Sequence, residues 1–234
     1  ILLIIITLFY NKNLLISQNI KYHFIRSIFS ILTIISFFFA YKYNFMTDVY
    51  ALSYSSVIFI VFFSKIFLKE KVPNKILISV IIGIIGIVIA LYPTSSKQLS
   101  IYSILPLSGA IFAAMNRVMI KKLTYLDHPF TIAIYPSFFI VLSLIPFYNS
   151  WIPFSDNKNH ILLFLLMGSL SVVSQCIIIY ATTFAKNVFL APCDYFTFVI
   201  VIITDHIFWN HNNNKGIYIR KKTIRTLNVF NLLL

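Results

Sequence analysis

The stretch KILISVIIGIIGIVIALY, residues 75–92, decides the class of fold. After its first residue it carries no charged side chain, and a helix needs roughly 20 such apolar residues to cross the hydrocarbon core of a bilayer. Working outward from it, we expect seven stretches of this kind to span a membrane: 24–43, 49–68, 75–92, 101–120, 129–148, 161–180 and 188–208. An eighth, residues 1–10, is about half the necessary length, and we interpret it as the end of a helix whose beginning is missing.

The composition excludes a water-soluble globular protein. Hydrophobic residues make up 59% of the 234 residues, aromatic residues 17% and charged residues only 11%, and the mean hydropathy is +0.89. A soluble domain of this length has too small an interior to bury so much apolar surface. We therefore predict an all-α, polytopic transmembrane helical bundle whose immediate partner is the lipid bilayer.

The connections between these stretches alternate between many and few basic residues. Lysine and arginine are enriched in short cytoplasmic loops, so the connections rich in them are expected to face the cytoplasm. These connections hold Lys12, Lys21, Arg26, Lys65, Lys69, Lys71, Lys75, Arg117, Lys121 and Lys122. Such loops and a basic tail account for the net charge of +13, so no nucleic-acid partner is predicted.

Residues 211–234 form a basic polar tail without a run long enough to span a bilayer. The alternation of loops leaves this tail outside the cell, whereas its basic residues belong inside, so one further crossing is expected to be missing. Two interpretations remain open. The first is a frameshift or truncation near Asn210, and the second is a genuine short cytoplasmic or interfacial tail.

A short pattern occurs twice in the chain. Tyr41, Phe45 and Val49 recur with the same spacing as Tyr180, Phe184 and Val188, in each case at the entry to an apolar stretch. Five expected spans separate the two copies, and because that number is odd, the copies must cross the membrane in opposite directions. Inverted repeats of this kind are typical of secondary transporters.

The residues around this repeat carry a family resemblance. Residues 24–93, with Arg26, Glu70 and the sequence GIIGIVIALYP from Gly83, resemble the first half of an EamA-type member of the drug/metabolite transporter superfamily. Residues 102–209, with Gly168, Ala191 and Pro192, are similar to the second half. The resemblance implies two inverted five-helix repeats with both termini cytoplasmic, here incomplete at both ends. It assigns 1–93 to the first repeat, 94–210 to the second without its last helix, and 211–234 to no part of the fold.

The resemblance also implies a function. Members of this family are secondary carriers or exchangers of small metabolites, which implies a transporter working by alternating access rather than an enzyme, without a cofactor, in the inner membrane of a bacterial cell as a multi-pass protein. The S-adenosylmethionine uptake branch is the most similar one, which implies S-adenosylmethionine or another zwitterionic or amino-acid-like solute. A truncated non-functional remnant and a membrane-embedded enzyme are the alternatives, and assembly as a homodimer is left open.

Polar side chains at membrane depth are costly and therefore mark functional sites. The candidates for substrate binding are Arg26, Tyr54, Asn116, Gln175, Asp194 and Tyr195. Asp194 follows Pro192, where a broken helix could expose carbonyl groups and the carboxylate, but it could equally be solvated by headgroups or paired with a base. Arg26 is expected to extend to the interface, with anion binding as the alternative. We hypothesise that Arg26 and Asp194 recognise the two ends of a zwitterion.

Other residues are assigned structural roles. Gly83 and Gly86 are expected to allow close helix packing, and hydrogen bonds between helices are expected from Asn116, Arg117, Ser174 and Gln175. The resemblance makes Glu70 and Pro192 motif residues, and Asn210 stands where a second-repeat counterpart of Glu70 is expected. No catalytic, nucleotide-binding or metal-binding spacing occurs in the sequence, and Cys176 and Cys193 are interpreted as apolar fillers.

Overall fold

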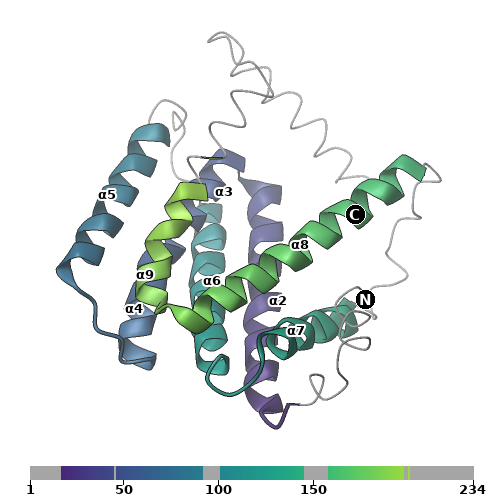
Figure 1. The fold of residues 1–234 in the computed structure, drawn as a ribbon. Helices are drawn as coiled ribbons and strands as arrows, with labels where there is room; N and C mark the ends of the chain where they lie inside the picture. Colours follow the sequence, from purple (N-terminus) through teal and green to yellow (C-terminus); the bar gives the residue numbers. More distant parts are fainter. Residues whose placement is uncertain (1–16, 45, 92–100, 145–157, 198–199, 201–234) are drawn as a thin grey trace.

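The computed structural model describes residues 17–44, 46–91, 101–144, 158–197 and 200, and within these ranges the chain contains helices and no strands (Figure 1). This confirms the all-helical class. The elements are α2 (Ile20–Tyr43), α3 (Met46–Ser53), α4 (Ser56–Phe67), α5 (Asn74–Leu91), η2 (Ile101–Ser103), α6 (Ile104–Leu123), α7 (Pro129–Leu144), α8 (Lys158–Phe184), α9 (Asn187–Leu190) and η4 (Ala191–Cys193).

Among the described residues, four helical segments are long and apolar enough to cross a membrane: Ile20–Tyr43, Val49–Phe67, Ile101–Leu123 and Leu165–Phe184. Shorter apolar helices cover Asn74–Gly86 and Pro129–Ser143. The predicted span 49–68 is not one uninterrupted helix, because a turn at Tyr54 and Ser55 separates α3 from α4. The predicted segment 1–10, the end of the predicted span 188–208 and the tail 211–234 lie outside the described residues.

Helix α6 lies at the centre of the bundle, where it contacts α2 on one side and α4 on the other (Figure 1). Small side chains allow this approach: Ala110 and Ala114 on α6 are fully buried, and a Cβ added at Gly109 would lie 3.2 Å from the Phe37 ring of α2. Close backbone approach through small residues is the usual basis of helix packing in membranes.

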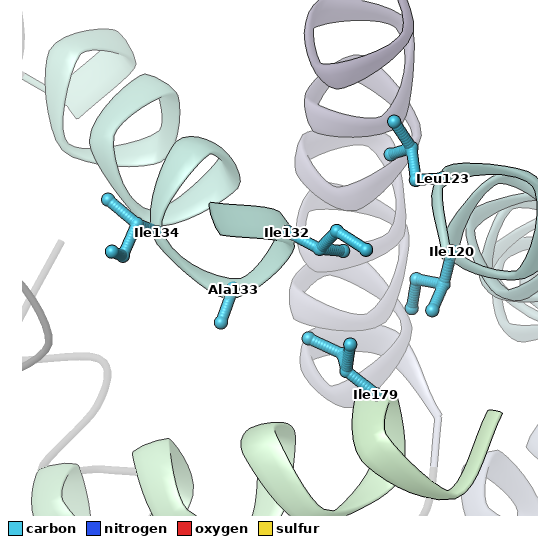
Figure 2. Close-up of a cluster of buried hydrophobic side chains, with 6 residues drawn as sticks. All are labelled: Ile120, Leu123, Ile132, Ala133, Ile134 and Ile179. Atoms are coloured by element: carbon cyan, nitrogen blue, oxygen red, sulfur yellow. The ribbon is translucent and has the colours of Figure 1, made fainter. Parts of the chain in front are cut away.

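A cluster of buried aliphatic side chains holds α6, α7 and α8 together at one end of α6 (Figure 2). The cluster consists of Ile120, Leu123, Ile132, Ala133, Ile134 and Ile179. Large apolar side chains elsewhere point outward, and Ile82 on α5 and Leu165 on α8 are 63% and 62% exposed. Exposed apolar surface of this extent suits a lipid environment, and it supports an integral membrane protein.

Candidate functional site

An ion pair links α6 to the helical turn that follows η4. Nη2 of Arg117 donates to both carboxylate oxygens of Asp194, at 2.9 and 3.0 Å. Of the alternatives for Asp194, the structure therefore selects pairing with a base. The two side chains remain 20% and 34% exposed, so the pair is not sealed inside the packed bundle and has surface on which a ligand can act.

Tyrosines surround this ion pair. The ring centroids of Tyr54, between α3 and α4, and Tyr195, next to Asp194, lie 6.4 Å apart, and the Asp194 carboxylate acts electrostatically on both phenol groups. We call Tyr54, Arg117, Asp194 and Tyr195 the central polar group. Tyr50 extends it toward Tyr41 on α2, with ring centroids 6.0 Å apart.

Glu70 fixes the segment that carries Asp194. Its buried carboxylate accepts hydrogen bonds from the backbone N–H groups of Asn187 at 3.3 Å and Val188 at 3.1 Å, the first residues of α9. The preceding Lys69 has φ of 54°, a left-handed conformation that turns the chain between Phe67 and Glu70. The Asn187 side chain in turn donates to the carbonyl of Arg117 at 3.1 Å, so α9 is held against α6 beside the ion pair.

Arg26 does not extend to the interface as expected. Its side chain is 3% exposed; Nε donates to the Asn116 side-chain oxygen at 3.2 Å, and Nη1 donates to the carbonyl of Ile132 on α7. A guanidinium with five donors is stable inside the bundle when such acceptors are provided. Asn116, which accepts the hydrogen bond from Arg26, directly precedes Arg117 of the central polar group on α6. The charged partner of Asp194 is nevertheless Arg117 and not Arg26.

Gly83 allows α5 to contact Tyr195. A Cβ at Gly83 would overlap the Tyr195 ring, whereas within the described residues nothing lies within 4 Å of a Cβ at Gly86. Gly83 thus lies at a close helix contact, whereas the close-packing expectation for Gly86 stays a prediction. At Pro192 the helix changes to a 3-10 turn, as expected of an interrupted helix, but the carbonyls of Ala191 and Pro192 both accept from the Asp194 amide and are not left open.

Gln175 is exposed on α8, as is the neighbouring Ser174, and neither joins the central polar group in the described structure. The predicted hydrogen bonding within the bundle is found for Asn116 and Arg117 instead. Arg117 was expected both in a base-rich connection and among the hydrogen-bonding residues of the bundle, but not as the base that pairs with Asp194. The signal was its position directly after Asn116, inside the predicted span 101–120.

Comparison with known proteins gives consistent matches. Residues 1–92 match the EamA-like transporter family. The chain is 24% identical over 195 residues to the pseudopaline exporter CntI of Pseudomonas aeruginosa strain UCBPP-PA14, covering 82% of this chain and 68% of that protein. It is 28% identical over 203 residues to a riboflavin transporter of Vibrio cholerae, with 82% and 66% covered.

A shorter match involves a riboflavin transporter of Brucella anthropi, which is 36% identical over 88 residues, or 38% of this chain and 31% of that protein. Together with the apolar helices, these similarities support an integral membrane protein that transports a small molecule, and residues 1–92 are similar to the EamA-like transporter family. They point to a transporter rather than an enzyme.

Proposed function

We propose that this chain is a secondary transporter that moves a zwitterionic small metabolite across a bacterial inner membrane by alternating access, with the central polar group as its substrate site. S-adenosylmethionine is the first candidate. This solute carries an α-amino acid group, a sulfonium cation and an adenine ring, so it combines both charges with a flat aromatic surface.

The partly exposed Arg117–Asp194 pair is the observation that carries the proposal. An ion pair at membrane depth is expensive to maintain, and its two members are of opposite charge and 2.9 Å apart. A zwitterion entering between them can place its carboxylate on the guanidinium and its ammonium on the carboxylate, so each charge exchanges one partner for another. The faces of Tyr54 and Tyr195 suit a cationic or aromatic group beside the pair.

The proposed architecture is a pair of inverted five-helix repeats that rock about this site. Two features support it. Val49 and Val188, which correspond in the sequence repeat, are both fully buried. A few residues after these valines, each copy departs from α-helical geometry, in a turn at Tyr54 and Ser55 in the first and in the 3-10 turn Ala191–Cys193 in the second.

The ends of the helices support a multi-pass orientation. In Figure 1, the start of α2, the α4–α5 connection, the α6–α7 connection and the start of α9 all lie at one end of the bundle. This end carries Lys21, Lys69, Lys71, Lys122 and Lys186. The positive-inside tendency makes this the cytoplasmic end.

Riboflavin is the competing substrate, because two relatives are named riboflavin transporters and paired tyrosines can stack on a flat ring. It differs from S-adenosylmethionine in carrying no zwitterionic amino acid group. The charged pair would then contribute little to recognition, which separates the two candidates experimentally.

Counterflow in proteoliposomes tests the proposal. Vesicles containing the chain are loaded with unlabelled S-adenosylmethionine, labelled S-adenosylmethionine is added outside, and a transient accumulation of label is expected. The same vesicles are tested with riboflavin. Chromatography of the recovered label distinguishes a carrier, which leaves the solute intact, from an enzyme, which alters it. No accumulation with either probe, or a chemically altered solute, would contradict the proposal.

A further inference from the structure

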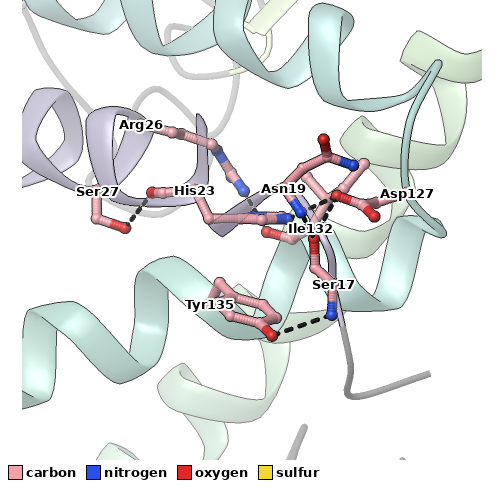
Figure 3. A network of polar contacts seen from close by, with 8 residues as sticks. All are labelled: Ser17, Asn19, His23, Arg26, Ser27, Asp127, Ile132 and Tyr135. Atoms are coloured by element: carbon pink, nitrogen blue, oxygen red, sulfur yellow. Dashed lines mark hydrogen bonds and ion pairs between the residues drawn. The ribbon is translucent and has the colours of Figure 1, made fainter. Parts of the chain in front are cut away.

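A second polar cluster lies where α2 begins (Figure 3), and it shares no residue with the central polar group. One oxygen of Asp127, in the α6–α7 connection, accepts a hydrogen bond from the Ser17 hydroxyl at 2.8 Å and contacts Nε2 of His23 at 2.9 Å. The backbone N–H of Ser17 donates to the Tyr135 hydroxyl on α7 at 3.2 Å. The cluster therefore ties the start of α2 to both α7 and the connection before it.

The histidine at the centre of this cluster is fully buried, and the Asp127 side chain is only 10% exposed. Since Nε2 faces the carboxylate, the neutral imidazole donates its proton there and presents a lone pair at Nδ1. Within the described part of the chain, Nδ1 of His23 is buried and has no hydrogen-bond partner. This is the atom at which a further proton would bind.

Two neighbours of His23, Tyr135 and Asp127, favour the protonated form and offset part of the cost of burial. The His23 ring stacks on Tyr135 with centroids 4.4 Å apart and planes at 22°, and an aromatic face stabilises a cation. Burial is the largest influence on the imidazole and opposes its protonation; Asp127 favours protonation, and Arg26, on the same helix, opposes it. On the α6 side, Lys122 lies over the Tyr22 ring at 4.2 Å. Among these neighbours, Asp127 is thus the group whose negative charge stabilises a protonated His23.

We propose that His23 and Asp127 form a proton-binding site that couples closure of this end of the transporter to proton occupancy. A hydronium ion from the solvent gives its proton to Nδ1 and becomes water, and this transfer changes the charge of the pair from −1 to 0. Chains of His and carboxylate groups inside membrane proteins are well suited to this task. The inference rests on the proposed transport function and assigns its coupling ion.

The position of the pair explains how occupancy would act on the fold. His23 belongs to α2, Asp127 to the α6–α7 connection and Tyr135 to α7. A protonated imidazole attracts the carboxylate more strongly than a neutral one, so the proton-loaded pair holds these elements together as the structure shows them. Loss of the proton weakens the tie and favours opening at this end.

Hydrogen–deuterium exchange of the full chain in lipid nanodiscs tests the site without any substrate. The peptide covering residues 17–27 should lose protection as pH rises between about 5 and 8, where histidine titrates. After correction for intrinsic chemistry, its opening should increase by up to about tenfold per pH unit, the limit for one linked proton. His23→Gln should remove the pH dependence, and His128→Gln, at an exposed histidine beside Asp127, should keep it.

Asp127→Asn provides a second variant if His23→Gln does not fold, and it should also abolish the pH dependence. Exchange of α6 and α8 peptides reports whether each variant is folded. A pH-independent 17–27 peptide in the unaltered chain, or an unchanged pH dependence in His23→Gln and Asp127→Asn, would overturn the assignment. Both outcomes are independent of whether a transported solute has been found.

Transport then tests the coupling itself. In vesicles that show S-adenosylmethionine counterflow, an imposed pH gradient should change the rate of net uptake about fivefold or more, and Asp127→Asn should lose this response while retaining counterflow. Counterflow without any response to the gradient in the unaltered chain would overturn the coupling role. Absence of counterflow contradicts the proposed function instead, and the exchange experiment still decides whether the proton site exists.

Discussion

At the residue scale, two glycines on one face of α5 differ in what they touch. Gly83 lies against the Tyr195 ring, and Gly86 has no such neighbour among the residues that the structure describes. Their sequence context is nearly the same, since both follow a pair of isoleucines. They therefore form a matched pair for testing whether the helix contact at Tyr195 matters.

Gly83→Ala is expected to lower the free energy of unfolding by about 1–3 kcal/mol, because the new methyl group overpacks the contact with Tyr195. Gly86→Ala should be neutral or slightly stabilising, since alanine has the higher helix propensity. Thermal unfolding in detergent measures both. Equal effects of the two substitutions would contradict the placement of α5.

The Tyr195 ring itself is predicted to contribute through its face. Tyr195→Leu should weaken S-adenosylmethionine binding by about fivefold to thirtyfold, corresponding to the roughly 1–2 kcal/mol of a desolvated cation–π contact, and Tyr195→Phe should weaken it less because it retains a ring. Tyr180→Leu, at an exposed tyrosine on α8, serves as the control. Competition in the counterflow assay measures the affinities, and equal losses for Phe and Leu would rule out recognition by the aromatic face.

At the element scale, the four-residue helix α9 depends on contacts from distant parts of the chain. The Glu70 carboxylate accepts hydrogen bonds from the first two backbone N–H groups of α9. The Asn187 side chain donates to α6 and so attaches α9 to that helix. Such a short helix has little stability of its own. The orientation of Asp194 toward Arg117 thus depends on Glu70, which is far from it in sequence.

Glu70→Gln is expected to reduce the free energy of unfolding by about 1–3 kcal/mol. The glutamine has one neutral acceptor oxygen in place of the carboxylate, and its NH2 group would face a backbone N–H that needs an acceptor. Lys71→Gln, at the exposed neighbouring residue, is the control. Chemical denaturation in detergent micelles measures the difference. A Glu70→Gln variant as stable as Lys71→Gln would show that the carboxylate does not hold α9.

Lys121 plays a comparable part at the C-terminal end of α8, just before α9 begins. Its side chain is 3% exposed, and Nζ donates to the carbonyls of Thr182 at 2.6 Å and Ala185 at 2.9 Å. Lys121→Met should therefore destabilise the fold by about 2–3 kcal/mol, because it leaves carbonyls at a helix end without their charged donor. Lys122→Met, at an exposed lysine, should cost about 1 kcal/mol or less. The same denaturation experiment compares them, and equal losses would be contrary to this account.

The sequence predicted the helices better than their contacts. Apolar length alone located α2, α5, α6 and most of α8, because the bilayer sets a minimum length. The turn at Tyr54 and Ser55 was missed, since neither residue is a glycine or proline. Arg26 was misjudged because its acceptors come from α6 and α7, and a rule for single helices near an interface cannot anticipate partners so distant in sequence.

The candidate site was predicted in part for the same reason. Tyr54, Asp194 and Tyr195 were selected as polar residues at membrane depth, and the structure brings them together. Gln175 was selected on the same ground but lies exposed on α8. The position of a residue along an apolar stretch gives its depth in the membrane. Whether its side chain points into the bundle or outward is harder to predict, because these helices have nearly equally apolar faces.

At the scale of the whole molecule, the described helices arrange two polar centres around α6. The central polar group joins α6 to the segment after η4, and the His23–Asp127 pair joins α2 to the α6–α7 connection. A carrier requires a site for its solute and an element that closes one end of the bundle. The arrangement supplies a candidate for each.

The most direct test of the account is the concentration dependence of S-adenosylmethionine counterflow by Asp194→Asn compared with the unaltered chain. Phe196→Leu, two residues further on at an exposed position, is the matched control. We predict that Asp194→Asn raises the KM by about tenfold or more, as expected for loss of a hydrogen-bonded charge pair, while Phe196→Leu leaves it unchanged. A folded Asp194→Asn protein with the KM of the unaltered chain would contradict the assignment of the substrate site.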